Sequence, residues 1–224
     1  MLAFGHPGIT LGIAVLLAGA SKRCRPSAHN GPPGGGHLSE QARSSISHLG
    51  RVTDWLDCLA RRVDIRLLLL GSLLPDLIDK PVGQLFFRQT FSNGRIFAHS
   101  LVFLLLISVI GWFLYRRAKR TWLLALAFGT ATHLVFDEMW HSLHTLLWPA
   151  YGFAFARGNL DNWMPSMLRS LVANPLEFTL EALGAVILAW FAVGLVRRKT
   201  VLTFVRYGVV SRQVSTGKGP RRMV

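Results

Sequence analysis

The sequence predicts an all-α membrane protein, a polytopic bundle of about five transmembrane helices with one amphipathic helix on the cytoplasmic side. Three observations support this prediction. The 224 residues are 51% hydrophobic and only 16% charged, whereas soluble domains usually have about 25% charged residues. Several apolar runs approach or reach the roughly 17–25 residues that a membrane helix needs. Lys and Arg are concentrated in alternate connections between these runs, as the positive-inside rule requires.

The apolar runs are spread along the whole chain. They cover residues 2–20, 63–78, 97–115, 121–139 and 176–196. The first run could instead be a cleaved signal peptide, but such a peptide has a positively charged segment before its apolar core. No Lys or Arg precedes this run, so we expect all five runs to be membrane helices.

Basic residues orient these helices. Residues 21–66, 116–120 and 197–224 hold eight, four and eight Lys or Arg, which is 20 of the 25 in the chain. Because these are alternate segments, we predict a multi-pass protein of the cell membrane with its N-terminus outside and its C-terminus in the cytoplasm. The net charge of +14 would suggest nucleic-acid binding in a soluble protein. Here anionic lipid headgroups account for the basic clusters, so we expect membrane lipid and no nucleic acid as a partner.

The chain divides into four segments on this basis. They are a first transmembrane helix at residues 1–20, a cytoplasmic linker and amphipathic helix at 21–62, a membrane bundle with the candidate metal motifs at 63–196, and a basic cytoplasmic tail at 197–224. Cys24 and Cys58 lie in the second segment and form no CxxC motif. We therefore expect neither a disulfide nor a zinc finger there.

Six histidines and aspartates fall at the outer ends of four of the predicted spans. They are His6, Asp76, Asp79, His99, His133 and Asp137. Asp76 and Asp79 are three residues apart, a spacing that puts both on one helix face. His133 and Asp137 are four apart, which has the same effect. Ionisable residues in membrane spans are functional candidates by default, and His with Asp suits zinc, manganese or iron. The sequence therefore predicts a site for one or two divalent ions, with zinc or manganese preferred and with Asp79 as a ligand or a general base.

Other polar residues near these positions have two interpretations each. Glu138, next to Asp137, is a candidate proton shuttle. His141, one helical turn further on, is either an additional ligand or an interfacial histidine. Glu177 and Glu181 either face the site or stabilise the N-terminus of their own helix.

Short motifs in a fixed order link the chain to a known family. They are GH at residues 5–6, LPDLIDKP at 74–81, AHSL at 98–101, HLVFD at 133–137 and LLWP at 146–149. In this order they resemble the YdjM-like family of bacterial and archaeal inner-membrane proteins, whose members are described as LexA-regulated, metal-dependent hydrolases. The resemblance implies that the same six histidines and aspartates are the metal-binding positions.

These observations predict a membrane-bound, metal-dependent hydrolase. The expected substrate is an ester or phosphoester of lipid-like character at the level of the outer headgroups. The alternative is a non-enzymatic metal-binding membrane protein or a transporter. Transporters tend to place their sites near the middle of the membrane on broken helices, whereas the polar residues here lie at helix ends.

Overall fold

The computed structural model describes residues 4–21, 51–89, 93–153, 155, 169, 173–208 and 210. Within these ranges every regular element is helical and no strand occurs. The longer helices coincide with the five apolar runs: α1 (Gly5–Ala20), α3 (Ile65–Lys80), α4 (Leu101–Ala118), α5 (Trp122–Phe136) and α8 (Pro175–Arg197). The all-α prediction is confirmed for the part of the chain that the structure describes.

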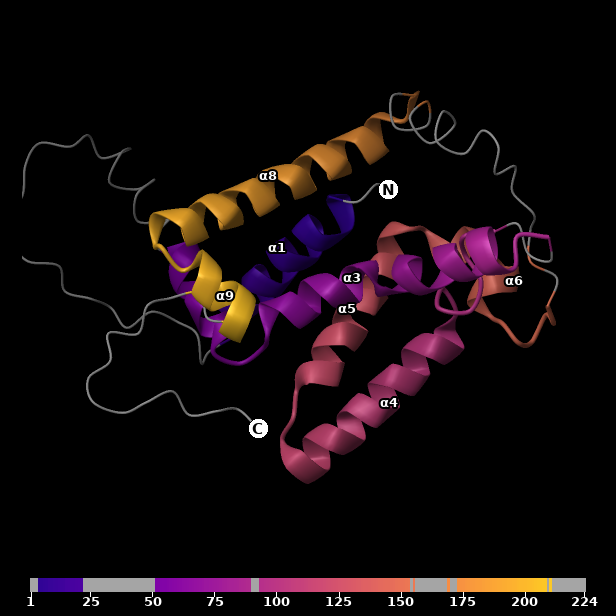
Figure 1. The fold of residues 1–224 in the computed structure, drawn as a ribbon, viewed down its shortest axis with the longest axis horizontal. Coiled ribbons are helices and arrows are strands. Elements are labelled where there is room, and N and C mark those ends of the chain that lie inside the picture. Colours follow the sequence, from indigo (N-terminus) through magenta and orange to yellow (C-terminus); the bar gives the residue numbers. More distant parts are fainter. Residues whose placement is uncertain are drawn as a thin grey trace, which may run out of the picture.

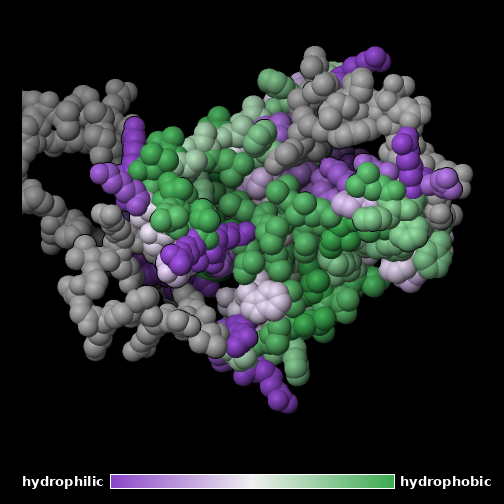
Figure 2. Space-filling model, viewed as in Figure 1, coloured by the Kyte–Doolittle hydropathy of each residue, from purple (hydrophilic) through white to green (hydrophobic). Residues whose placement is uncertain are grey.

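Two of these helices, α4 and α8, are long and apolar enough to cross a membrane, with 18 and 23 residues. Helices α1 and α5 are apolar but shorter, with 16 and 15 residues. Gly111 is the one buried residue of α4, so this helix presents almost its whole apolar surface outward. Figure 2 shows hydrophobic residues over the middle of the molecule, with hydrophilic side chains toward its ends.

Glycines allow two pairs of helices to pack with their backbones in close contact. In the α1–α8 pair, Gly8 lies so near the Gly184 carbonyl that a Cβ would clash with it, and the two helices run side by side (Figure 1). In the α3–α5 pair, a Cβ on Gly129 would lie 2.5 Å from the Leu68 carbonyl oxygen. Small residues at contacts of this kind drive helix association in membranes, and here they bring α5 against the middle of α3.

Pro75 interrupts the hydrogen bonds inside α3. Proline has no N–H, so the carbonyl four residues earlier, that of Gly71, loses its partner within the helix. The Thr130 hydroxyl on α5 donates to this carbonyl at 3.2 Å. A backbone group left free in an apolar environment is costly, and α5 supplies the missing donor.

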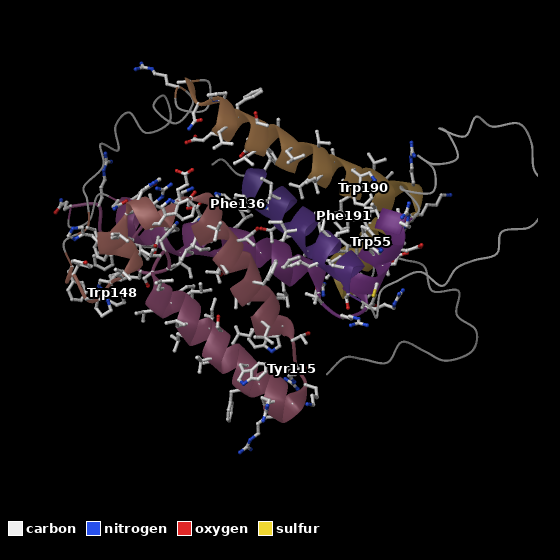
Figure 3. All side chains as sticks on the ribbon, turned by 180° about the vertical axis from the view of Figure 1, so that it is seen from behind. Trp55, Tyr115, Phe136, Trp148, Trp190 and Phe191 are labelled. Carbon is white, nitrogen blue, oxygen red and sulfur yellow. The ribbon has the colours of Figure 1, made fainter. Side chains whose placement is uncertain are left out.

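The apolar core lies at the end of the molecule where α1 and α8 finish. Buried residues from five segments form it, namely Leu11, Ala14, Val15, Leu56, Leu59, Ile65, Leu68, Phe191, Leu195 and Val210. Trp55 and Trp190 pack against this core, far from Trp148 at the opposite end (Figure 3). The metal motifs therefore do not share the main hydrophobic core.

The helix expected after residue 38 is helical at residues 51–60 and packs into this core, while its earlier part lies outside the described residues. Cys58 in this helix is disulfide-bonded, so the expectation of free cysteines is wrong. Sequence reasoning excluded the bond because it assumed a reducing compartment, and a compartment says nothing about whether two thiols come within bonding distance.

Shorter elements complete the described chain. They are a π-helix η2 (Pro81–Phe86), a 3-10 helix η3 (Met139–His141), α6 (Leu143–Leu146) and α9 (Val201–Tyr207). The η2 segment continues α3 without a break and bears the exposed side chains of Leu85 and Phe86. Of the predicted basic tail, the part through Tyr207 forms a helix, and most of the rest lies outside the described residues.

Candidate metal centre

The six predicted residues come from four helix ends on one side of the bundle (Figure 1). His6 is in the first turn of α1, and His99 lies directly before α4. Asp76 and Asp79 are in the last turns of α3. His133 is in the last turn of α5, whose C-cap is Asp137. Residues up to 131 positions apart in the sequence thus meet within a few ångströms, as the distances below show.

Asp79 binds the segment that leads into α4. Its Oδ2 accepts hydrogen bonds from the backbone N–H groups of Ile96 (2.7 Å) and His99 (3.2 Å). Its Oδ1 accepts from those of Phe97 (3.2 Å) and Ala98 (3.0 Å). The His99 ring adds a fifth contact, with Nδ1 2.7 Å from Oδ2. Asp79 is fully buried, and its oxygens are occupied by this segment rather than directed at the other candidate ligands.

The two central histidines are each held through Nδ1. Because the partner of His99 Nδ1 is a carboxylate, this nitrogen carries the proton. His133 Nδ1 lies 2.7 Å from the Ser72 carbonyl oxygen, which can only accept, so it carries the proton as well. The close packing of α3 against α5 puts this carbonyl within reach.

With both Nδ1 atoms protonated, each Nε2 has a lone pair in the neutral form of its ring. These two Nε2 atoms face each other at 3.2 Å, and both rings are fully buried. Two lone pairs at this distance repel each other unless a proton or a metal ion lies between them. Both Nε2 atoms are thus placed to bind a cation.

His6 supplies a third imidazole beside this pair. Its ring is 4.1 Å from that of His133, measured between centroids. His6 is 1% exposed, and neither of its ring nitrogens forms a hydrogen bond. Nε2 lies 3.2 Å from Asp137 Oδ1, but not in hydrogen-bond geometry. His6 Nε2 and an oxygen of Asp137 are therefore placed to bind a common metal ion.

Two carboxylates complete the cluster, and a cation contacts the outer oxygen of each. Asp76 Oδ1 lies 3.6 Å from His99 Nε2, and Asp76 Oδ2 lies 2.6 Å from Lys80 Nζ. Asp137 Oδ2 lies 3.8 Å from His99 Nε2 and 3.9 Å from His133 Nε2, and it also pairs with the Arg95 guanidinium at 2.8 Å.

These residues form two overlapping groups of three. Within each group, the ligand atoms lie within 4.8 Å of one another. The groups are His6, His133 and Asp137, and Asp76, His99 and His133. Ligands at about 2.1 Å from a tetrahedral zinc ion are about 3.4 Å apart. The observed separations of 3.2–3.9 Å are close to this value. The donor set of imidazole and carboxylate suits zinc or manganese.

The remaining predicted residues lie elsewhere. Glu138 and His141 contact each other at 3.4 Å, and their side chains are 52% and 70% exposed. Neither belongs to the two groups found among the described residues. The proton-shuttle role of Glu138 and the ligand role of His141 stay predictions.

Glu181 has a function that neither interpretation anticipated. It is buried on α8, but it does not stabilise its own helix end. Its two oxygens accept hydrogen bonds from the backbone N–H groups of Phe4 (2.8 Å) and Gly5 (3.0 Å) at the start of α1. Because free N–H groups at a helix start favour a carboxylate, Glu181 fixes the turn that bears His6. Glu177, by contrast, is half-buried in the first turn of α8.

Sequence reasoning also missed Arg95, Lys80 and the Ser72 carbonyl. Lys80 directly follows Asp79 in the LPDLIDKP motif, and its spacing of four from Asp76 predicts a salt bridge on a helix. No comparable signal marks Arg95, because it approaches Asp137 only through the fold.

Comparison with known proteins gives one match. A family model described as YdjM inner membrane protein matches residues 1–201. Comparison with curated proteins and with solved structures found no match.

Proposed function

The chain belongs to the YdjM inner membrane protein family, and from this membership and the buried His/Asp cluster we propose that it is a membrane-bound, metal-dependent hydrolase. The substrate that we propose is an ester or phosphoester of lipid-like character. The observation that supports this most strongly is the pair of buried Nε2 atoms, those of His99 and His133, that face each other at 3.2 Å.

We propose that His6, His99, His133, Asp76 and Asp137 hold a single ion. His133 belongs to both groups of candidate ligands, but its Nδ1 is bonded to the Ser72 carbonyl. Only Nε2 is left for a metal, and one imidazole nitrogen binds one ion. Of the one or two ions that the sequence allowed, this chemistry favours one.

Asp79 acts in this proposal as a positioning residue for His99. A carboxylate that accepts a hydrogen bond from the far nitrogen of a ligand histidine fixes the ring and raises its basicity. The Ser72 carbonyl does the same for His133. When bound, a divalent ion lowers the pKa of a bound water toward neutrality and polarises the oxygen of the scissile bond. An ion held by these residues would supply the activated water for hydrolysis, in which the C–O or P–O bond of the ester would break and the alcohol would take a proton.

The surroundings of the cluster support a lipid-like substrate. Leu85 and Phe86 of η2, just beyond Asp79 and Lys80, are 75% and 76% exposed. On another side Phe97 packs edge-on against the ring of Trp148 at 5.1 Å between centroids. Aromatic residues prefer the headgroup level of a membrane, so a substrate there can place its headgroup at the cluster and its chain in lipid.

Elemental analysis of the purified protein tests the metal site. We expect about one zinc or manganese ion per wild-type chain and almost none in His133→Ala, since His133 belongs to both groups. His141→Ala is the matched control, because its exposed ring lies outside the cluster, and it should retain the ion.

Activity is tested with a lipid phosphoester in detergent micelles. We expect turnover by the wild type, loss of turnover with a chelator, and recovery when the divalent ion is returned. Equal metal content in wild type and His133→Ala would contradict the proposed site. Metal retention without turnover of any ester or phosphoester would contradict the hydrolase and favour a metal-binding protein or transporter.

A further inference from the structure

Each aspartate of the cluster contacts both the buried histidines and a partly exposed cation. Asp76 directs Oδ1 toward His99 and Oδ2 toward Lys80. Asp137 has Oδ1 beside His6, and its Oδ2 contacts the Arg95 guanidinium. The side chains of Lys80 and Arg95 are 44% and 43% exposed, whereas Asp76 and Asp137 are 20% and 4% exposed. The two cations therefore lie between the buried centre and the outside.

The backbone holds these cations beside each other. Lys80 is in the last turn of α3, directly after the buried Asp79. Arg95 directly precedes the segment that Asp79 binds through four N–H groups. A Cβ on Gly94 would lie 3.3 Å from Lys80 Cγ, so the chain before Arg95 runs against the Lys80 side chain. The same Cβ would lie 2.6 Å from Gln84 Nε2, so the Gln84 side chain also packs against this turn.

We propose that Lys80 and Arg95 form an anion-binding rim that selects a phosphoester as the substrate. This inference rests on the proposed function, because it takes the His/Asp cluster to be a metal centre. Guanidinium groups bind phosphate oxygens through two parallel hydrogen bonds, and lysine binds phosphate as a point charge. An uncharged carboxylic ester has no anionic oxygens for these two groups.

Metal binding and the rim are linked through the shared carboxylates. Without an ion, Lys80 pairs with Asp76 and Arg95 pairs with Asp137. A divalent ion in the cluster neutralises the same carboxylates, so it weakens their attraction for the two side chains. Partly exposed ion pairs contribute little to stability, and the two cations can turn toward a phosphate at small cost.

This linkage predicts that removal of the two cations weakens the binding of phosphate but not the binding of the metal ion. The test uses the full chain in detergent, Mn²⁺ as the metal probe and inorganic phosphate as the anion probe. The paramagnetic resonance signal of free Mn²⁺ gives the metal affinity, and ³¹P relaxation by bound Mn²⁺ gives the phosphate affinity. In Lys80→Gln/Arg95→Gln we expect Mn²⁺ to bind as tightly as in wild type or more tightly. Phosphate should bind at least tenfold more weakly, since charge-assisted hydrogen bonds are lost.

Arg117→Gln is the matched control. It removes one positive charge at the far end of α4 from His99 and should leave both affinities unchanged. Lys80→Arg/Arg95→Lys keeps the charges and should keep most of the phosphate affinity. Two further experiments replace inorganic phosphate by phosphatidate in micelles or by soluble glycerol phosphate. The ligand that binds more tightly shows whether the phosphoester belongs to a lipid or to a soluble molecule.

Two results would overturn the rim. One is unchanged phosphate binding by Lys80→Gln/Arg95→Gln that still holds Mn²⁺. The other is a parallel loss of Mn²⁺ and phosphate, which would mean that the cations hold the cluster together and do not bind substrate. Absence of Mn²⁺ and of every other divalent ion from the wild type would contradict the proposed function itself.

Discussion

Asp76 and Asp79 lie three residues apart on α3 but have different surroundings. Asp79 is fully buried and accepts four backbone N–H bonds and a contact from His99 Nδ1. Asp76 is 20% exposed and pairs with Lys80. Asp79 therefore organises the chain around His99, and Asp76 presents an oxygen to the cluster.

This difference predicts that the two isosteric variants separate stability from metal binding. Asp79→Asn replaces an acceptor oxygen by an NH₂ group that faces N–H donors. We expect a loss of about 3 kcal/mol in the free energy of unfolding in detergent and a metal affinity lowered by about 10–100-fold. Asp76→Asn should weaken metal binding but cost less than about 1 kcal/mol, since its ion pair is partly exposed. Thermal unfolding and metal titration of both variants check this, and equal destabilisation by the two would contradict it.

Residue type alone identified the histidines and aspartates of the cluster, but it did not predict the contacts that position each side chain. Charged or imidazole side chains at the ends of apolar runs stand out in a sequence, and all six lie at helix ends that meet. The role of Asp79 was not readable, because four of its partners are backbone N–H groups and any residue type could supply them. Arg95 was missed for a similar reason, since its pairing with Asp137 spans 42 positions of the chain.

At the scale of helices, the pair α3–α5 positions His133. The break at Pro75 frees the Gly71 carbonyl for Thr130, and the next carbonyl, that of Ser72, binds His133 Nδ1. A helix in α3 with its full set of internal hydrogen bonds would offer α5 fewer free acceptors. The proline of the LPDLIDKP motif is therefore connected to the metal cluster through α5.

A double-mutant cycle tests this connection. Thr130→Val removes the hydroxyl with little change of shape and should cost about 0.6 kcal/mol, the average for such bonds in membranes. In a Pro75→Ala background the new N–H at residue 75 bonds to the Gly71 carbonyl, so Thr130→Val should cost almost nothing there. The free energies of unfolding of the four proteins in detergent give the coupling. The same cost of Thr130→Val in both backgrounds would contradict the proposed role of Thr130.

The approximate positions of the helices were predictable from the apolar runs, whereas the residues at which α4 begins and α5 ends were not. The run at 97–115 was expected to include His99, but the Ser100 side chain caps α4 by accepting from the Phe103 N–H at 3.2 Å, so His99 lies before the helix. The run at 121–139 ends early, since Glu138 has a left-handed backbone with φ of 51°. The first difference occurs where the Ser100 side chain bonds the backbone, and the second occurs at a left-handed residue. Hydrophobic periodicity detects neither of these local effects.

On the scale of the whole molecule, two observations assign the helix at residues 51–60 to different compartments. The excess of Lys and Arg in residues 21–66 predicts the cytoplasm, whereas the disulfide at Cys58 is typical of an oxidising compartment. The charge count rests on the whole chain and the disulfide on one bond, so we expect the charge count to decide the orientation. The His/Asp cluster would then face the outer side of the membrane.

Cysteine labelling tests this orientation at two exposed positions. Phe87 follows η2 near the cluster, and Arg117 is at the other end of α4. In a Cys24→Ser/Cys58→Ser background, Phe87→Cys should react with a membrane-impermeant maleimide on intact cells or spheroplasts. Arg117→Cys should react only after the membrane is permeabilised. Reversed labelling would place the cluster in the cytoplasm and restrict its substrates to that side, and labelling of both positions from one side would contradict the membrane-spanning arrangement of α4.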